Sequence, residues 1–217
     1  MTLAERWVAA WTYARGLEVE MVDGWPLVRV GLASRESELV CWDPGPRAFA
    51  KLLSHIDGDP RAMLTVIAAD LTPYTSLVLP PGIRVDRDDE TLMSVTLTPP
   101  DLTPHDPEFC TRWIVGDSII SLALETDSRV AVEGTVGILG TDAVFDAIET
   151  TPAYQRRGLG RWIMAMLTSC ALDHGATHGV LAATTSGRGL YEALGWEPSF
   201  PMWSLMGVSE QHDQRRT

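Results

Sequence analysis

Hydrophobic residues recur along the first hundred positions with alternating helical and strand-like spacing. Apolar side chains three and four positions apart predict helices, and short apolar runs bounded by turn residues predict strands. The pattern predicts an amphipathic helix, a hairpin, a second helix and two strands, in that order, at residues 1–16, 27–44, 47–56, 62–69 and 91–97.

The stretch TPPDLTPHDPEF, residues 98–109, interrupts this pattern with four prolines. Proline lacks a backbone N–H and fixes its φ angle, so neither a helix nor a central strand is expected there. We therefore place a boundary near Pro100. It predicts an N-terminal α/β subdomain of unknown role at residues 1–100 and a second domain at residues 101–217.

Beyond this boundary the pattern changes to three strand-like runs, followed by a helix, a strand, a short helix and a last strand. The predicted order is β-β-β-α-β-α-β, which is typical of a fold of the α/β (α+β) class. These elements are expected at residues 112–125, 129–140, 143–151, 158–174, 178–184, 187–196 and 202–206.

The composition is that of an ordinary globular chain, with 45% hydrophobic residues and a net charge of −12. This charge argues against a nucleic-acid partner, which needs a basic surface, and it favours solubility and the approach of a cationic amine. The three cysteines are far apart and predict neither a metal site nor disulfides. The first sixteen residues resemble neither a signal peptide nor a membrane span, so we expect a cytoplasmic protein without a membrane partner.

The loop TTPAYQRRGLG, residues 150–160, joins the third strand-like run to the long helix. The first N–H groups of a helix lack partners within the helix, and the helix dipole adds positive charge there. Two glycines admit a ligand to the backbone and neighbouring arginines add charge, so the loop suits a pyrophosphate. A plain turn with solvated arginines is the alternative. The sequence lacks the pattern of a P-loop and the third glycine of a Rossmann fingerprint.

The motif QRRGLG, residues 155–160, resembles the [QR]-x-x-G-x-[GA] signature of the GNAT superfamily of N-acetyltransferases. Downstream, GRGLYEALGW at residues 187–196 resembles the second marker of that family, a tyrosine in a short helix before Leu-Gly-Phe or Leu-Gly-Trp. The resemblance covers residues 112–206. It implies a central mixed β-sheet flanked by helices, with residues 1–100 as either a degenerate GNAT half or a subdomain that covers the substrate.

The same resemblance implies a binding site for acetyl-CoA, the co-substrate, where the strand FDAIET splays from the strand GVLAAT. The pantetheine amides would pair with the backbone of Ile148 and Thr150, and the amides of residues 155–161 would surround the pyrophosphate. No metal is implied. The implied cofactor-binding residues are Ile148, Thr150, Gln155, Arg156, Arg157, Gly158, Leu159, Gly160, Arg161 and Thr184.

Tyr191 matches the tyrosine that the family places near the cofactor sulfur. The resemblance implies that it protonates the leaving thiolate as a general acid. A core tyrosine packed under the sheet is the alternative. Thr184 departs from the family, because many relatives have asparagine seven residues before the tyrosine, and a hydroxyl replaces only part of the bonding of an amide.

The attacking amine must lose a proton, and Asp146 and Glu149 are the candidate bases on the strand before the loop. On an ideal strand Asp146 shares a face with Ile148 and Thr150, while Glu149 points the other way. The family resemblance implies that this strand often bulges, and a bulge would change these faces. An acidic residue in an apolar strand costs free energy unless it is solvated or paired, which suggests a site. A salt bridge at the strand end is the alternative. Glu133 is a further carboxylate expected nearby.

Three functions compete on these observations. The first is an N-acetyltransferase that moves acetyl from acetyl-CoA to a primary amine of a small molecule by direct attack, and the intact QRRGLG with Tyr191 favours it. The second is a non-catalytic acyl-CoA-binding sensor or partner module. The third, a tRNA-directed acetyltransferase, conflicts with the net charge of −12. The amine acceptor, the acyl chain preference and a homodimer are left open.

Overall fold

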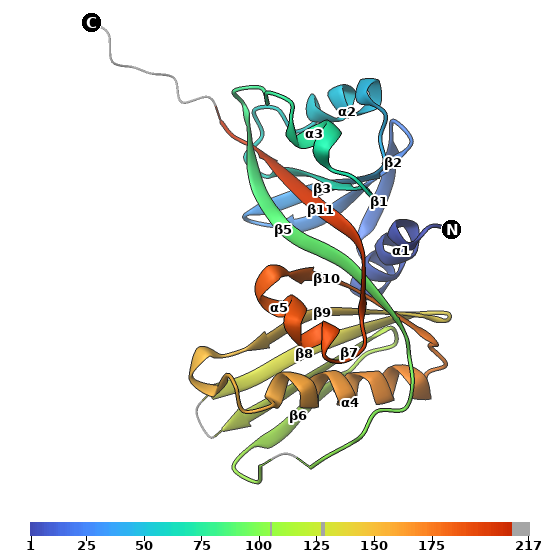
Figure 1. The fold of residues 1–217 in the computed structure, drawn as a ribbon, viewed down its shortest axis with the longest axis vertical. Coiled ribbons are helices and arrows are strands. Elements are labelled where there is room, and N and C mark those ends of the chain that lie inside the picture. The colour runs from blue at the N-terminus through green and yellow to red at the C-terminus, as the bar shows by residue number, and fades with distance from the viewer. Residues whose placement is uncertain (105, 127–128, 210–217) are drawn as a thin grey trace, which may run out of the picture. The chain divides into compact units, whose positions relative to one another are not determined.

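The computed structural model describes residues 1–104, 106–126 and 129–209 (Figure 1). The chain forms two compact units: unit 1 contains Met1–Gly16 and Leu92–Ser199, and unit 2 contains Leu17–Thr91 and Phe200–Thr217. Two long strands, β5 (Ile83–Thr96) and β11 (Glu197–Gly207), begin in one unit and end in the other. These units differ from the division at Pro100, because the N-terminal helix belongs to unit 1 and most of the last strand belongs to unit 2.

Unit 1 is a mixed sheet with the strand order β5-β10-β9-β8-β7-β6. Strands β6 to β9 form an antiparallel meander, whereas β9 and β10 are parallel and are joined by the crossover helix α4. The elements are α1 (Leu3–Arg15), β6 (Cys110–Val115), β7 (Ile119–Thr126), β8 (Arg129–Leu139), β9 (Asp142–Thr150), a 3-10 turn (Pro152–Tyr154), α4 (Leu159–Asp173), β10 (His178–Thr184) and α5 (Thr185–Glu192).

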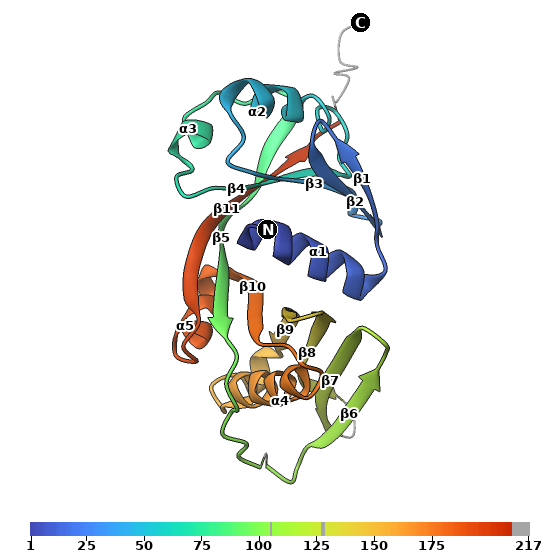
Figure 2. The ribbon, with the colours of Figure 1, turned by 90° about the vertical axis from the view of Figure 1, so that its right-hand side faces the viewer.

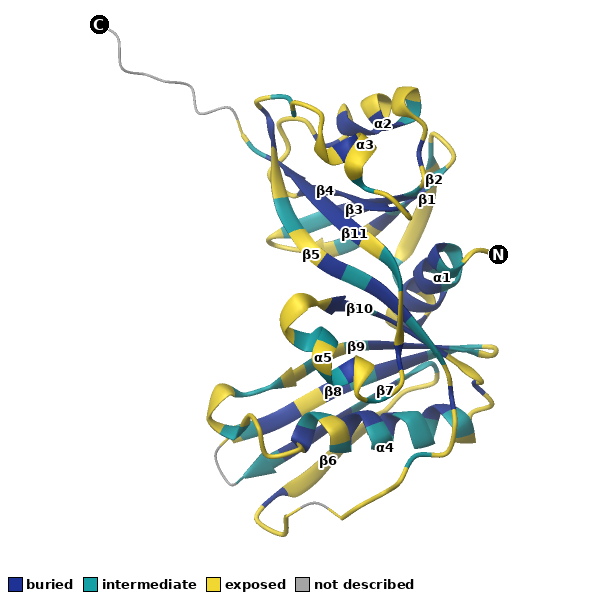
Figure 3. Ribbon diagram, in the orientation of Figure 1, coloured by how far each residue is buried: buried dark blue, intermediate teal, exposed yellow. Residues whose placement is uncertain are grey.

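Helices α1 and α4 cover opposite faces of this sheet (Figure 2). A Cβ atom added at Gly134 of β8 would lie 3.2 Å from Leu167 of α4, whereas one added at Gly137 would clash with Ala14 of α1. Positions three apart on a strand point to opposite sides, so each glycine lets one helix approach its own face closely. The buried side of α4, dark blue in Figure 3, is Leu159, Ile163, Met164, Leu167 and Ala171.

Helix α1 has strong signals at both ends. Thr2 and Glu5 form a reciprocal capping box at its start, and Gly16 ends it in the left-handed conformation with φ of 60°. Its Trp7 and Trp11 rings are stacked with centroids 5.6 Å apart, and both side chains are buried. No helix in the described ranges is long and apolar enough to cross a membrane.

Unit 2 is a second mixed sheet with the strand order β1-β2-β3-β4-β11-β5. Strands β3 and β4 are parallel and are joined by α2, whose Phe49 and Leu52 are completely buried in a core with Leu39, Leu64 and Trp203. The elements are β1 (Glu18–Val22), β2 (Trp25–Leu32), β3 (Arg35–Trp42), α2 (Pro46–Leu53), β4 (Ala62–Ile67) and α3 (Thr72–Thr75).

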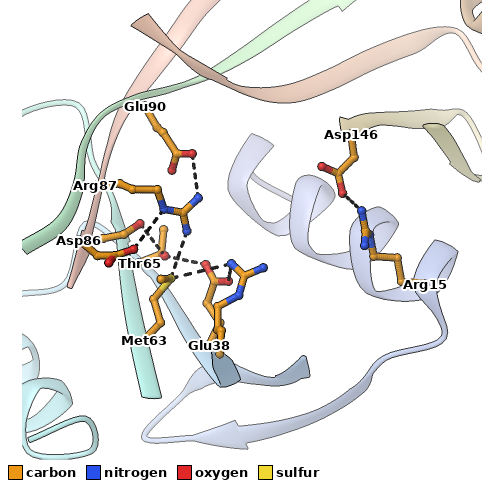
Figure 4. Close-up of polar contacts among 10 residues, drawn as sticks. Arg15, Glu38, Met63, Thr65, Asp86, Arg87, Glu90 and Asp146 are labelled. Atoms are coloured by element: carbon orange, nitrogen blue, oxygen red, sulfur yellow. Dashed lines mark hydrogen bonds and ion pairs between the residues drawn. The ribbon is translucent and has the colours of Figure 1, made fainter. Parts of the chain in front are cut away.

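A charged network is buried in unit 2 (Figure 4). Glu38 is only 2% exposed, and its two carboxylate oxygens accept from Thr65 Oγ1 at 2.6 Å and from Arg35 Nη1 at 2.7 Å. A buried carboxylate is tolerated when both oxygens have partners. Nearby, Arg87 donates to Glu90 at 2.8 Å, and burial raises the pKa of Glu90.

The chain repeats one order of elements. The segments β1-β2-β3-α2-β4-α3-β5 and β7-β8-β9-α4-β10-α5-β11 both have the order β-β-β-α-β-α-β, with a parallel crossover pair in each. Both predictions for the N-terminal region, a degenerate copy and a subdomain that covers the substrate, stay predictions. The copies differ at the crossover pair, because β3 and β4 stay in register over residues 37–42 and 62–67, whereas β9 and β10 pair only over 142–144 and 178–180.

One sequence prediction about strands is wrong, and one strand was not predicted. The run at residues 112–125 is not one strand but the hairpin β6–β7, because the chain turns at Gly116, whose N–H donates to the carbonyl of Ile119 at 2.9 Å. Strand β1 was not predicted, because four of its five residues are exposed and its sequence has no buried face.

Candidate functional site

A cavity opens where β9 and β10 separate. The two strands pair from Asp142–His178 to Val144–Val180 and are not paired with each other beyond that point. The cavity has a volume of about 760 Å³, which lies within the range of small-molecule sites. Its wall is formed by residues 145–150 of β9, the loop and first turn of α4, the end of β10 and one side of α5.

All of the site residues predicted from the sequence line this cavity, with the exception of Arg157. The structure therefore brings the candidate acid, the candidate bases and the candidate cofactor residues together. Those that line it are Tyr191, Asp146, Glu149, Ile148, Thr150, Gln155, Arg156, Gly158, Leu159, Gly160, Arg161 and Thr184.

Two residues of the cavity wall have a left-handed backbone, Ala147 with φ of 52° and Arg156 with φ of 65°. Among the described residues other than glycine, only Asp23 and Asp43 share this conformation, and aspartate tolerates it. For alanine and arginine it costs roughly 1–2 kcal/mol each. Such strain persists only where the surroundings enforce it, and it is concentrated at functional sites.

Ala147 belongs to a β-bulge in β9. The β8–β9 register pairs Glu133 with Glu149 and then Thr135 with Asp146, so one residue of β8 faces two residues of β9. An extra residue bends the strand and ends its simple alternation of sides. The bulge therefore changes which side chains share a face.

The side chains of β9 are distributed differently from the prediction. Asp146 faces α1, where it forms an ion pair with Arg15. Ile148 lies over Gly134 on the α4 face, and Thr150 faces α4 as well, because a Cβ at Gly160 would lie 3.7 Å from its Oγ1. The faces expected of an ideal strand do not apply, because a bulge of the kind that the family resemblance implies lies between Asp146 and Ile148.

The first turn of α4 forms one end of the cavity. The helix begins after Gly158, which has φ of 80° and makes no side-chain cap. The N–H groups of residues 158–161 donate to no other residue in the described part of the chain. Arg156 and Arg161 line the same cavity. Free helix N–H groups and two guanidinium groups together favour an anion.

The cavity wall also carries acidic residues. Asp146 pairs with Arg15 (Figure 4), is 39% exposed at its side chain and accepts from the Ala147 N–H at 2.7 Å. Glu149 is exposed and lies directly opposite Glu133 in the β8–β9 register. Like charges opposite each other in a sheet repel, so these carboxylates favour a cation.

Tyr191 lies on α5, is 7% exposed and packs edge-on against Trp196 with ring centroids 6.2 Å apart. Burial, and to a smaller extent the negative charge of Asp146, raise the pKa of Tyr191 to about 12. The phenol therefore remains protonated at neutral pH. It lines the cavity and also belongs to the core cluster of unit 1, so the two alternatives weighed for it are not exclusive.

Thr184 and Arg157 already have structural partners. Thr184 is the N-cap of α5, where its hydroxyl accepts from the Gly187 N–H at 3.3 Å. Arg157 points away from the cavity, pairs with Glu108 and lies over the Phe109 ring at 5.1 Å. A threonine hydroxyl directly before a short helix is a capping signal, so the sequence could have indicated the N-cap role of Thr184.

The sequence analysis missed Arg15 and Ala147. Arg15 is 131 positions away from Asp146 in the sequence, and no local pattern indicates such a contact. The left-handed conformation of Ala147 is equally hidden, because alanine gives no signal of positive φ.

Comparison with solved structures identifies the architecture. A GCN5-related N-acetyltransferase from Kribbella flavida has a TM-score of 0.66 at 15% identity, covering 95% of this chain and 96% of that chain. The fold is that of the GNAT acetyltransferases. A GNAT-family protein from Novosphingobium aromaticivorans has a TM-score of 0.63 at 17% identity, with 95% and 97% covered.

A third structure with this fold is a tandem GNAT protein from the clavulanic acid biosynthesis pathway, with a TM-score of 0.54 at 14% identity, covering 83% of this chain and 77% of that chain. No family model and no curated protein sequence matches the chain. The GNAT fold confirms the predicted α/β class with a mixed sheet flanked by helices.

Proposed function

We propose that this protein is an acyl-CoA-dependent N-acyltransferase that transfers acetyl from acetyl-CoA to a primary amine of a small molecule. The observation that carries the proposal is that one cavity is lined by two chemically different sets of groups. Free helix N–H groups and two arginines form the first set, and two carboxylates with a protonated tyrosine form the second. The first suits the pyrophosphate of CoA, and the second suits an amine that meets a thioester.

The residues of the loop and of the first turn of α4 fit the cofactor chemically. The N–H groups of residues 158–161 would donate to the pyrophosphate oxygens, and Arg156 and Arg161 would add charge. Gln155 donates to the Thr150 carbonyl at 3.2 Å and so holds the loop against β9. The backbone of Ile148 and Thr150 faces the separation of the strands, where the pantetheine amides would pair.

A carboxylate of β9 and the Tyr191 hydroxyl supply the groups for proton transfer and hydrogen bonding. The amine nitrogen forms a bond to the thioester carbonyl carbon, its proton passes to a carboxylate of β9 directly or through water, and the carbon–sulfur bond breaks. Tyr191 donates a hydrogen bond to the departing sulfur. Its pKa of about 12 lies about 3.5 units above that of an alkyl thiol. A complete proton transfer is therefore uphill, and Tyr191 stabilises the thiolate chiefly as a hydrogen-bond donor.

The N-terminal copy does not offer a second cofactor site. Its β3–β4 pair stays in register to the ends of both strands. Its crossover helix α2 begins with Pro46, which has no N–H to donate, and the Tyr74 hydroxyl donates to the Pro44 carbonyl at 2.8 Å. The proposal therefore includes one acetyl-CoA per chain.

Calorimetric titration with acetyl-CoA, free CoA and a longer acyl-CoA tests this proposal. We expect saturable binding with one site per chain, followed by release of free CoA thiol when a panel of small primary amines is added. Binding without thiol release for any amine would favour a non-catalytic acyl-CoA sensor instead. Absence of binding to all three ligands would overturn the cofactor assignment.

A further inference from the structure

We propose that Arg15 and Asp146 form a clamp that holds the bulge of β9 in its left-handed conformation, so that Asp146 is a positioning residue and not the catalytic base. The significance of the bulge for catalysis rests on the proposed function. The clamp itself rests only on contacts within unit 1.

Both oxygens of the Asp146 carboxylate are engaged. One accepts from the N–H of Ala147 at 2.7 Å, and the other forms the ion pair with Arg15 (Figure 4). The lone pairs that point along these two bonds are not available to an attacking amine. The carbonyl of Asp146 is held as well, because Thr135 Oγ1 donates to it at 3.0 Å.

The hydrogen bond to Ala147 has a specific structural consequence. Ala147 has φ of 52°, a conformation that alanine adopts only when its surroundings enforce it. A side-chain acceptor on the preceding residue stabilises the N–H of a residue in a turn-like conformation. Arg15 in turn orients that acceptor. The clamp thereby fixes the point at which Ile148 and Thr150 turn to the α4 face.

Helix α1 forms two ion pairs with β9. Arg15, its last residue, reaches the bulge, while Arg6 pairs with Asp142, the first residue of the strand, with 3.0 Å from Nε to Oδ2. The two arginines thus hold the same strand through the same kind of ion pair. Only the first pair touches the bulge, so the second provides a matched control.

The clamp leaves Glu149 as the carboxylate of β9 that accepts the proton of the amine. Glu149 lies beyond the bulge, lines the cavity and is exposed. The charged and titratable groups that face this region are Asp146 and Glu149 of β9, Glu133 of β8, Arg15 of α1 and Tyr191 of α5.

Four variants of the full chain separate the two roles of Asp146. Asp146→Asn keeps an acceptor for the Ala147 N–H but loses the ion pair with Arg15, so a clamp predicts a kcat within tenfold of that of Arg15→Gln, whereas loss of a base typically costs a further 10²–10⁴-fold. Asp146→Ala removes the acceptor and should lower both kcat and acetyl-CoA affinity by tenfold or more. Ala147→Gly relieves the strain, so the double variant Asp146→Ala with Ala147→Gly should recover most of that loss. Glu149→Gln should lower kcat by 10²–10⁴-fold, as expected for loss of a general base, and leave acetyl-CoA affinity within about tenfold.

Hydrogen exchange of the amide at position 147 tests the clamp without any assay of activity. We expect exchange to accelerate at least tenfold in Arg15→Gln and in Asp146→Ala, and to stay unchanged in Arg6→Gln. Equal exchange in Arg15→Gln and the wild type would overturn the clamp even if the enzyme is active. A fall of more than a hundredfold in kcat for Asp146→Asn relative to Arg15→Gln, without rescue by Ala147→Gly, would identify Asp146 as the base. If the wild-type protein binds no acyl-CoA, the proposed function fails, and the exchange result still decides on the clamp.

Discussion

Replacement of Tyr191 by phenylalanine should remove a specific part of the alkaline sensitivity of this protein. The pKa of Tyr191 is raised to about 12 by burial and by Asp146, against about 10 in an unfolded chain. Below about pH 10 the phenol is protonated in both states, and its contribution to stability is fully present. Between about pH 10 and 12 only the unfolded state ionises, so stability is lost as the pH rises.

The size of this loss follows from the shift. One pKa unit corresponds to about 1.4 kcal/mol. The phenol should therefore lower the free energy of unfolding by about 1.4 kcal/mol at pH 11 and by about 2.7 kcal/mol above pH 12. Phenylalanine keeps the ring against Trp196 and has no proton to lose.

Denaturant unfolding of both proteins near pH 9 and pH 11 measures the effect as a double difference, in which the contributions of all other groups cancel. We expect the wild type to lose about 1.3 kcal/mol more than Tyr191→Phe over this interval. Equal losses in the two proteins would show that Tyr191 is not held in a buried, charge-sensitive environment, and its role as a protonated donor would lose its physical basis.

Three further substitutions or reagents probe other features. Gly158→Glu should abolish acetyl-CoA binding in calorimetry, whereas Gly158→Asn, which tolerates φ of 80°, should keep it within about tenfold; equal affinity for both variants would refute the loop assignment. Gly137→Ala should destabilise the protein by about 1–3 kcal/mol in denaturant unfolding, because its Cβ clashes with α1, while Gly189→Ala in open space should stabilise it by up to about 1 kcal/mol; the reverse order would contradict the packing. Alkylation followed by mass spectrometry should label exposed Cys110 first and spare Cys41, whose thiol pKa is raised by burial; labelling of both at one rate would contradict that burial.

Features that depend on neighbouring residues could be predicted from the sequence. The spacing of Leu159, Ile163 and Leu167 places α4 within one residue of its observed start, and all three are buried. The run QRRGLG lies in the loop before that helix, and its use as an anion site stays a prediction. The helix prediction succeeded because short-range periodicity determines it.

Features that depend on distant residues could not be predicted. Asp146 forms its ion pair with Arg15, which lies 131 positions away in the sequence. Arg157 is indistinguishable from Arg156 in the motif, yet it leaves the cavity because Glu108 and Phe109 provide a better site for it. Such preferences are set by tertiary contacts, which override local pattern.

The ion pairs between α1 and β9 have a consequence for the order in which this protein can fold. Arg6 and its partner Asp142 are 136 residues apart in the sequence. At about 5–20 residues per second, a ribosome needs roughly 7–30 seconds to make the strand that the helix needs. During that time helix α1 lacks the strands β8 and β9 that it contacts in the folded protein. We expect nascent chains that lack β9 to present the apolar side of α1 to chaperones, and protection to begin only once β9 has left the exit tunnel.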